Sequence, residues 1–147
     1  MRVLIVDDEV SIRLLCKVNL MAEGFVVHEA GTRAEVLPAV AAFRPDIVLL
    51  DLMLPGVDPH DEWAVARDLR ADALGATLPI VFLSARADLR GQEEGSIPGP
   101  VGYLTKPFNP LELAPLVREL LARIESGERD VLRGEKLAAL RSLMDLD

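Results

Sequence analysis

Five short apolar runs, separated by longer amphipathic stretches, constrain the fold of this chain more than any other feature. Three of the runs are nearly unbroken Val, Ile and Leu. Unbroken rather than alternating apolarity indicates strands buried on both faces, which is typical of a parallel sheet. We expect strands at Val3–Val6, Phe25–His28, Ile47–Leu50, Ile80–Leu83 and Gly102–Leu104.

The stretches between these runs predict helices, so strand and helix alternate along the chain. Such alternation favours an α/β fold with right-handed crossovers and helices on both faces of a doubly wound sheet. Pro38 and Pro115 each fall six residues past an expected N-cap, so we expect a kink or a later helix start at each. The expected helices are Val10–Ala22, Arg33–Phe43, Trp63–Ala71, a weak one at Ala87–Glu94 in front of a Gly/Pro-rich segment, and Leu111–Glu125.

Charge and composition narrow the classes of partner. Sixteen Lys and Arg against 24 Asp and Glu give a net charge of −8, which argues against binding nucleic acid or an anionic membrane through bulk charge. No apolar run approaches the roughly 20 residues of a membrane span, and a single cysteine excludes an internal disulfide. The tail after Gly127 is too short for a three-helix DNA-binding domain. We therefore expect a cytoplasmic protein with no direct DNA binding and no membrane contact.

Polar residues follow four of the five expected strands. Asp7 and Asp8 follow the first strand, Asp51 the third, Ser84 the fourth and Lys106 the fifth. Ligands of doubly wound sheets bind beyond the carboxyl ends of the strands, where three carboxylates would repel one another unless a cation joined them. Oxygen ligands of this kind favour Mg²⁺. A lone Asp in such a place is more often a helix N-cap, but the combination with a hydroxyl and a lysine favours a site.

Four strings carry a family resemblance. They read VLIVDDE from Val3, DIVLLDLMLPG from Asp46, PIVFLSA from Pro79 and GYLTKPF from Gly102, and Ser84 precedes Lys106 by 22 residues (106 − 84). Over Met1 to about Ser126 the chain resembles a response-regulator receiver domain of two-component (His–Asp phosphorelay) signalling. The resemblance implies a flavodoxin-like (βα)5 fold with strand order 2-1-3-4-5 in residues 1–126. Residues 127–147 would then form a short C-terminal helical tail or linker.

The resemblance also assigns the acidic residues. Asp51 is implied to be the phosphoacceptor, whose carboxylate takes the phosphoryl group of a phosphohistidine to form an acyl phosphate. Asp8, Asp51 and the Met53 backbone carbonyl are implied to bind Mg²⁺, or Mn²⁺ in its place. Asp7 is implied to act on the metal through a bound water.

Three further residues are assigned in the same way. Lys106 is implied to contact the phosphoryl oxygens, aided by a cis Lys106–Pro107 bond, and the Ser84 hydroxyl is implied to bind another oxygen after phosphorylation. Tyr103 matches the aromatic switch residue of the family, which fills the space that the serine leaves. A strand-edge tyrosine is otherwise often only half buried, and that interpretation of Tyr103 stays open.

The implied partners are a sensor histidine kinase or phosphotransfer protein as donor and an unidentified output protein. A homodimer through the tail, or through the face made by the fourth and fifth helices, is also open. We expect no enzyme activity beyond catalysis of the protein's own phosphorylation and dephosphorylation. The loop from Asp58 to Trp63 is longer than the family pattern; His60 within it is a solvated residue more readily than a metal ligand.

Two other functions compete with a phosphorylated receiver. One is a receiver-like module that docks a partner without phosphorylation, against which the complete set of acids, serine and lysine argues. The other is an aspartyl-phosphate phosphohydrolase. That class needs Asp-x-Asp after the first strand, whereas here Asp7 and Asp8 are adjacent.

Overall fold

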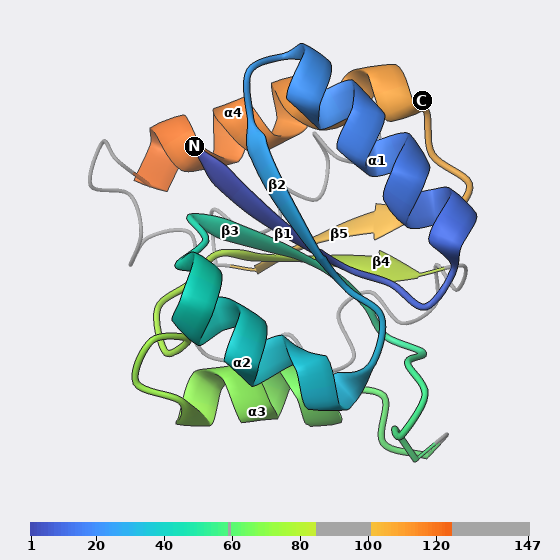
Figure 1. The fold of residues 1–147 in the computed structure, drawn as a ribbon, viewed down its shortest axis with the longest axis vertical. Helices are drawn as coiled ribbons and strands as arrows, with labels where there is room; N and C mark the ends of the chain where they lie inside the picture. Colours follow the sequence, from blue (N-terminus) through green and yellow to red (C-terminus); the bar gives the residue numbers. More distant parts are fainter. Residues whose placement is uncertain (59, 85–100, 125–147) are drawn as a thin grey trace.

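The computed structural model describes residues 1–58, 60–84 and 101–124. Its centre is one parallel sheet with the strand order β2-β1-β3-β4-β5, as predicted (Figure 1). The strands span β1 Arg2–Val6, β2 Val26–Ala30, β3 Ile47–Asp51, β4 Ile80–Ser84 and β5 Val101–Thr105. Since all five run the same way, their carboxyl ends lie along one edge of the sheet.

Helices cover both faces of the sheet. Figure 1 shows α1 and α4 together on one face and α2 and α3 on the other. The helices span α1 Val10–Ala22, α2 Arg33–Phe43, α3 Ala64–Ala71 and α4 Leu113–Arg123, with a 3-10 turn, η2, at Pro110–Glu112. None of the helices in the described part is long and apolar enough to cross a membrane. The helix predicted at 87–94 and the tail predicted at 127–147 lie outside the described residues.

The two prolines have different consequences. α2 begins at Arg33 and contains Pro38 in its interior, so the later start considered for this helix is not observed. The last helix does begin later, at Leu113 rather than Leu111, so Pro115 lies in its first turn, where the missing amide costs no helical hydrogen bond. Before it, the Leu111 amide donates to Asn109 Oδ1 at 3.0 Å and Pro110 starts the 3-10 turn.

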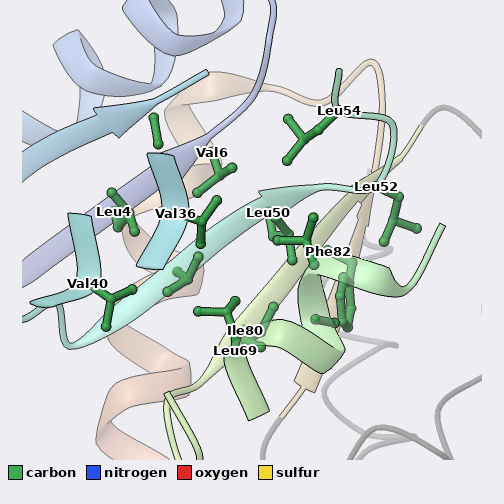
Figure 2. Close-up of a cluster of buried hydrophobic side chains, with 14 of the residues drawn as sticks. Leu4, Val6, Val36, Val40, Leu50, Leu52, Leu54, Leu69, Ile80 and Phe82 are labelled. Carbon is green, nitrogen blue, oxygen red and sulfur yellow. The ribbon is translucent and has the colours of Figure 1, made fainter. Parts of the chain in front are cut away.

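The apolar runs are unbroken because side chains on each strand pack alternately against the two helical layers. On one side Leu4, Leu50 and Phe82 pack with residues of α2 and α3 (Figure 2). On the other, Val3 and Leu49 pack with residues of α1 and α4. Burying both faces of the sheet fixes the strand register and thereby the positions of the residues that follow each strand.

Candidate functional site

Three carboxylates meet at the carboxyl edge of the sheet. Asp7 and Asp8 follow β1 and Asp51 ends the neighbouring strand β3, and one carboxylate oxygen of each lies within 4.8 Å of the others. Asp7 is 0% exposed and Asp51 6%, whereas Asp8 is exposed. The pairing of β1 with β3 thus brings Asp51 beside Asp7 and Asp8, although Asp51 lies 44 residues after Asp7 in the sequence (51 − 7).

A lysine from the far edge of the sheet reaches this acidic pocket. Lys106 directly follows β5, and its Nζ lies 2.7 Å from Asp7 Oδ2 and 3.6 Å from Asp51 Oδ2. The Lys106–Pro107 bond is cis, as the resemblance implied. Three carboxylates and one ammonium leave the pocket with two uncompensated negative charges (−3 + 1). That charge and the all-oxygen donor set fit a hard divalent cation.

Asp7 is held at every polar atom of its backbone and side chain. Its amide donates to the Ala30 carbonyl at 3.1 Å, and its carbonyl accepts from Arg13 Nη1 at 2.6 Å. Of its carboxylate oxygens, Oδ1 accepts the Glu9 amide at 2.9 Å and Oδ2 accepts Lys106. Both carboxylate oxygens of Asp7 are therefore already engaged by protein donors.

The protonation of Asp51 is shaped by opposing effects. Burial, as the largest effect, and the charges of Asp7 and Asp8 raise the pKa of this carboxyl to about 6. The Met53 amide, which donates to Oδ1 at 3.1 Å, and the Lys106 ammonium act against this rise. For Lys106, burial alone would lower the pKa, but its hydrogen bond to Asp7 and the surrounding carboxylates outweigh this and raise it. Lys106 therefore stays protonated and positively charged at neutral pH.

Ser84 lies at the same edge. It ends β4, next to Leu83, which pairs with Asp51 across the strands, and its carbonyl accepts the Lys106 amide at 2.7 Å. Tyr103 lies in β5 and is 4% exposed, rather than half buried. Its ring centroid lies 5.3 Å from that of Phe82, on the face covered by α2 and α3.

Arg13 is the functional candidate that the sequence did not reveal. Its partners are the Asp7 carbonyl and the Glu29 carboxylate, and only the pairing of β1 with β2 makes them neighbours. A faint signal existed in the Glu9–Arg13 spacing of four residues, but that pair is not the one formed. His60, in the long loop, is not a member of the acidic cluster; its amide donates to Asp58 Oδ1 at 2.9 Å.

Comparisons with known proteins agree with this geometry. The family model described as response regulator receiver domain matches residues 3–118. The DNA-binding response regulator MtrA of Mycolicibacterium smegmatis is 41% identical over 131 residues, covering 89% of this chain and 55% of that protein. The chemotaxis response regulator CheY4 of Vibrio cholerae superposes with a TM-score of 0.71 at 28% identity, over 81% of this chain and 97% of that chain.

A third relative was solved with a metal ion. It is the receiver domain of the sensor histidine kinase PA1611 from Pseudomonas aeruginosa, with magnesium coordinated in its active-site cleft. Its TM-score is 0.68 at 26% identity, over 82% of this chain and 97% of that chain.

The expectation of no direct DNA binding is wrong for this group of proteins. MtrA is named a DNA-binding response regulator, and the chain spans about half the length of the curated relatives it matches. The acidic charge and the short tail describe only these 147 residues. They carry no information on the rest of a protein of that length, and so they could not exclude DNA binding.

Proposed function

Because the chain belongs to the response regulator receiver domain family, we propose that Asp51 is its phosphoacceptor and that a phosphohistidine is the donor. The observation that carries this proposal is the meeting of Asp51 with Asp7, Asp8 and Lys106 in one pocket. With its pKa raised only to about 6, Asp51 is ionised at neutral pH and attacks without a general base.

The pocket holds the groups that a divalent cation needs. We propose Asp8, Asp51 and the Met53 backbone carbonyl as direct ligands of Mg²⁺, or of Mn²⁺ in its place, with Asp7 acting through a water. When bound, the cation neutralises charge on the phosphoryl oxygens. The magnesium in the PA1611 receiver domain supports this assignment.

The transfer itself is proposed to depend on positioning. An Asp51 oxygen forms a bond to phosphorus as the phosphorus–nitrogen bond of the phosphohistidine breaks, and the electron pair of that bond returns to the imidazole. Lys106 is already within 3.6 Å of Asp51 and would contact the phosphoryl oxygens without a large movement. Positioning and charge neutralisation suffice for phosphoryl transfer of this kind. The protein thereby catalyses only its own phosphorylation and dephosphorylation.

Phosphorylation is proposed to shift the population between two packings. It adds nearly two negative charges at Asp51, toward which the Ser84 hydroxyl would move. Tyr103, on the strand next to Ser84, would follow into the vacated space. Residues 1–126 would form this switching domain and residues 127–147 a tail or linker, within a cytoplasmic protein. The tail, or the face of the helix predicted at 87–94 and the last helix, α4, would serve as a surface for a second copy or an output protein.

The surface beside the pocket supports a protein as donor. Val10, Leu14 and Val18 form an exposed apolar stripe along α1. A cavity of about 360 Å³ opens next to this helix, between Glu9, Ile12, Leu15, Lys106, Pro107 and Phe108. Exposed apolar surface of this kind is typical of protein–protein contacts. The cavity beside it is lined in part by Lys106, the lysine of the acidic pocket. A sensor histidine kinase or phosphotransfer protein fits this requirement.

The test is labelling by a small phosphodonor in the presence of Mg²⁺, followed by intact mass. We expect one phosphoryl group on the wild type and on Asp68→Asn, and none on Asp51→Asn. Asp68 is the matched control because it is paired with Arg33 on the surface, away from the pocket. Labelling that persists in Asp51→Asn would refute the assignment. Absence of any labelling favours the docking module, and turnover of a free phosphomonoester favours the phosphohydrolase.

A further inference from the structure

We propose that Arg13 is a positioning residue of the acidic pocket, which orients the Asp7–Asp8 peptide so that the Asp8 carboxylate faces Asp51. The inference rests on the proposed metal-binding function of these acids. It concerns a residue outside the set of acids, serine and lysine to which that function is assigned.

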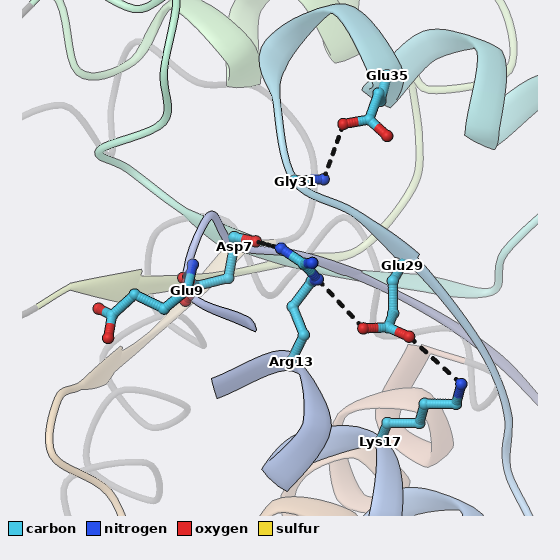
Figure 3. A network of polar contacts seen from close by, with 7 residues as sticks. All are labelled: Asp7, Glu9, Arg13, Lys17, Glu29, Gly31 and Glu35. Carbon is cyan, nitrogen blue, oxygen red and sulfur yellow. Dashed lines mark hydrogen bonds and ion pairs between the residues drawn. The ribbon is translucent and has the colours of Figure 1, made fainter. Parts of the chain in front are cut away.

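The contacts of Arg13 join three segments. Its Nη1 donates to the Asp7 carbonyl at 2.6 Å and its Nε to Glu29 Oε1 at 3.1 Å (Figure 3). Its side chain is 18% exposed, and Asp7 is fully buried. The guanidinium thus ties the turn after β1, which carries the acids, to the end of β2.

The hydrogen bond from Arg13 acts on Asp8 because of where the Asp7 carbonyl lies in the backbone. The Asp7 carbonyl belongs to the planar peptide that joins Asp7 to Asp8, so the direction of the carbonyl sets the orientation of the whole unit. The next peptide is held by the Glu9 amide, which donates to Asp7 Oδ1 at 2.9 Å. Arg13 and the Glu9 amide therefore fix two successive peptides, and Asp8 lies between them.

The Arg13 guanidinium lies close against Gly31. A Cβ at Gly31 would lie 2.9 Å from Arg13 Nη1 and 3.6 Å from its Cζ, so the side chain must shift if residue 31 has one. Glu35 Oε1 accepts the Gly31 amide at 3.2 Å, which anchors this loop from the side of α2. Figure 3 shows the Arg13 guanidinium between Asp7 and Glu29, with Gly31 above it in this view.

The matched pair for a test is Arg13→Met and Lys17→Met. Both remove one cation that contacts Glu29, since Lys17 Nζ lies 3.3 Å from Glu29 Oε2, but only Arg13 contacts Asp7. Mn²⁺ affinity is measured by titration of the protein. Removal of a positive charge near an acidic site should strengthen cation binding, whereas loss of a positioning contact should weaken it. A purely electrostatic role and a positioning role of Arg13 therefore predict opposite changes in Mn²⁺ affinity.

We expect Arg13→Met to bind Mn²⁺ about tenfold more weakly than the wild type, with Lys17→Met equal or slightly tighter. Gly31→Ala keeps every charge and displaces only the guanidinium, so it should also weaken binding. Because it retains the arginine, it remains informative if Arg13→Met fails to fold. Unchanged or tighter binding by folded Arg13→Met, or wild-type affinity in Gly31→Ala, would overturn the proposal.

Hydrogen exchange of the Glu9 amide provides a readout that needs no metal. We expect this amide to exchange faster in Arg13→Met than in Lys17→Met, and equal exchange in the two variants would overturn the positioning role. Failure of the proposed function is distinct, because it appears as a wild type that binds no Mn²⁺. In that case the Glu9 exchange rates still decide whether Arg13 positions the turn.

Discussion

Asp51 is expected to destabilise the metal-free protein at neutral pH, so Asp51→Asn should stabilise it. The pKa of Asp51 is raised from 3.8 to about 6, chiefly by burial, and each unit corresponds to 1.36 kcal/mol between the protonation states. A difference of about 2 units gives an ionisation cost of about 3 kcal/mol. Asparagine has nearly the same shape and carries no charge, so it should recover most of this free energy of unfolding.

The pH dependence follows from the direction of the shift. Between pH 3.8 and about 6 the folded protein binds more protons than the unfolded chain, so stability falls as pH rises through this window. The cost is absent at lower pH and complete above pH 6. The advantage of Asp51→Asn over the wild type should therefore be about 3 kcal/mol at pH 8 and small at pH 4.

Urea unfolding in EDTA, followed by the fluorescence of the single tryptophan, Trp63, measures this difference. With a slope of about 2 kcal/mol per M, the midpoint of Asp51→Asn should lie about 1.5 M above that of the wild type at pH 8. Saturating Mg²⁺ should narrow the gap, because it stabilises the wild type more. An equal gap at both pH values, or a variant no more stable than the wild type at pH 8, would show that burial of the Asp51 charge is not the cause.

Two further substitutions test the pocket and the core. Lys106→Met leaves the buried Asp7 carboxylate without its cation and should lower the free energy of unfolding, measured in urea, by about 3 kcal/mol. Lys17→Met is the surface control and should lower it by less than about 1 kcal/mol. Similar losses in the two variants would contradict the argument. Phe82→Ala should lower the free energy of unfolding, measured by thermal unfolding, by about 3–5 kcal/mol, because Phe82 is fully buried. It should also shift the fluorescence emission of Trp63, whose ring centroid lies 5.0 Å from that of Phe82. A decrease below about 1 kcal/mol would contradict the close packing of Phe82 in the core.

The sheet was predictable from the sequence because short, continuous apolar runs that alternate with amphipathic stretches are typical of strands buried on both faces. Val3–Val6 and Ile47–Leu50 lie within observed strands, and both are buried on two faces. Boundaries were less predictable where tertiary contacts decide them. Phe25 was expected to start a strand, but its amide donates to the Leu20 carbonyl at the end of α1, and β2 begins one residue later.

The residues of the candidate site likewise fall into those that the sequence could predict and those that it could not. Asp7, Asp51 and Lys106 could be placed together because parallel strands end at one edge, whatever the distance between them in the chain. Arg13 could not, because its role depends on a backbone carbonyl that every residue carries and on Glu29, whose register with Ile5 exists only in the folded sheet. Side chains that serve a site through main-chain atoms leave no spacing pattern in the sequence.

The unfavourable features of the pocket are those that its proposed function requires. Burial of Asp51 raises its pKa and costs stability, and the two uncompensated negative charges add to that cost. The same charges would provide the affinity for a divalent cation. Substitutions that remove this cost, such as Asp51→Asn, should therefore stabilise the fold and abolish phosphorylation together. A variant that gained stability at Asp51 and kept its labelling would separate the two properties and contradict this view of the site.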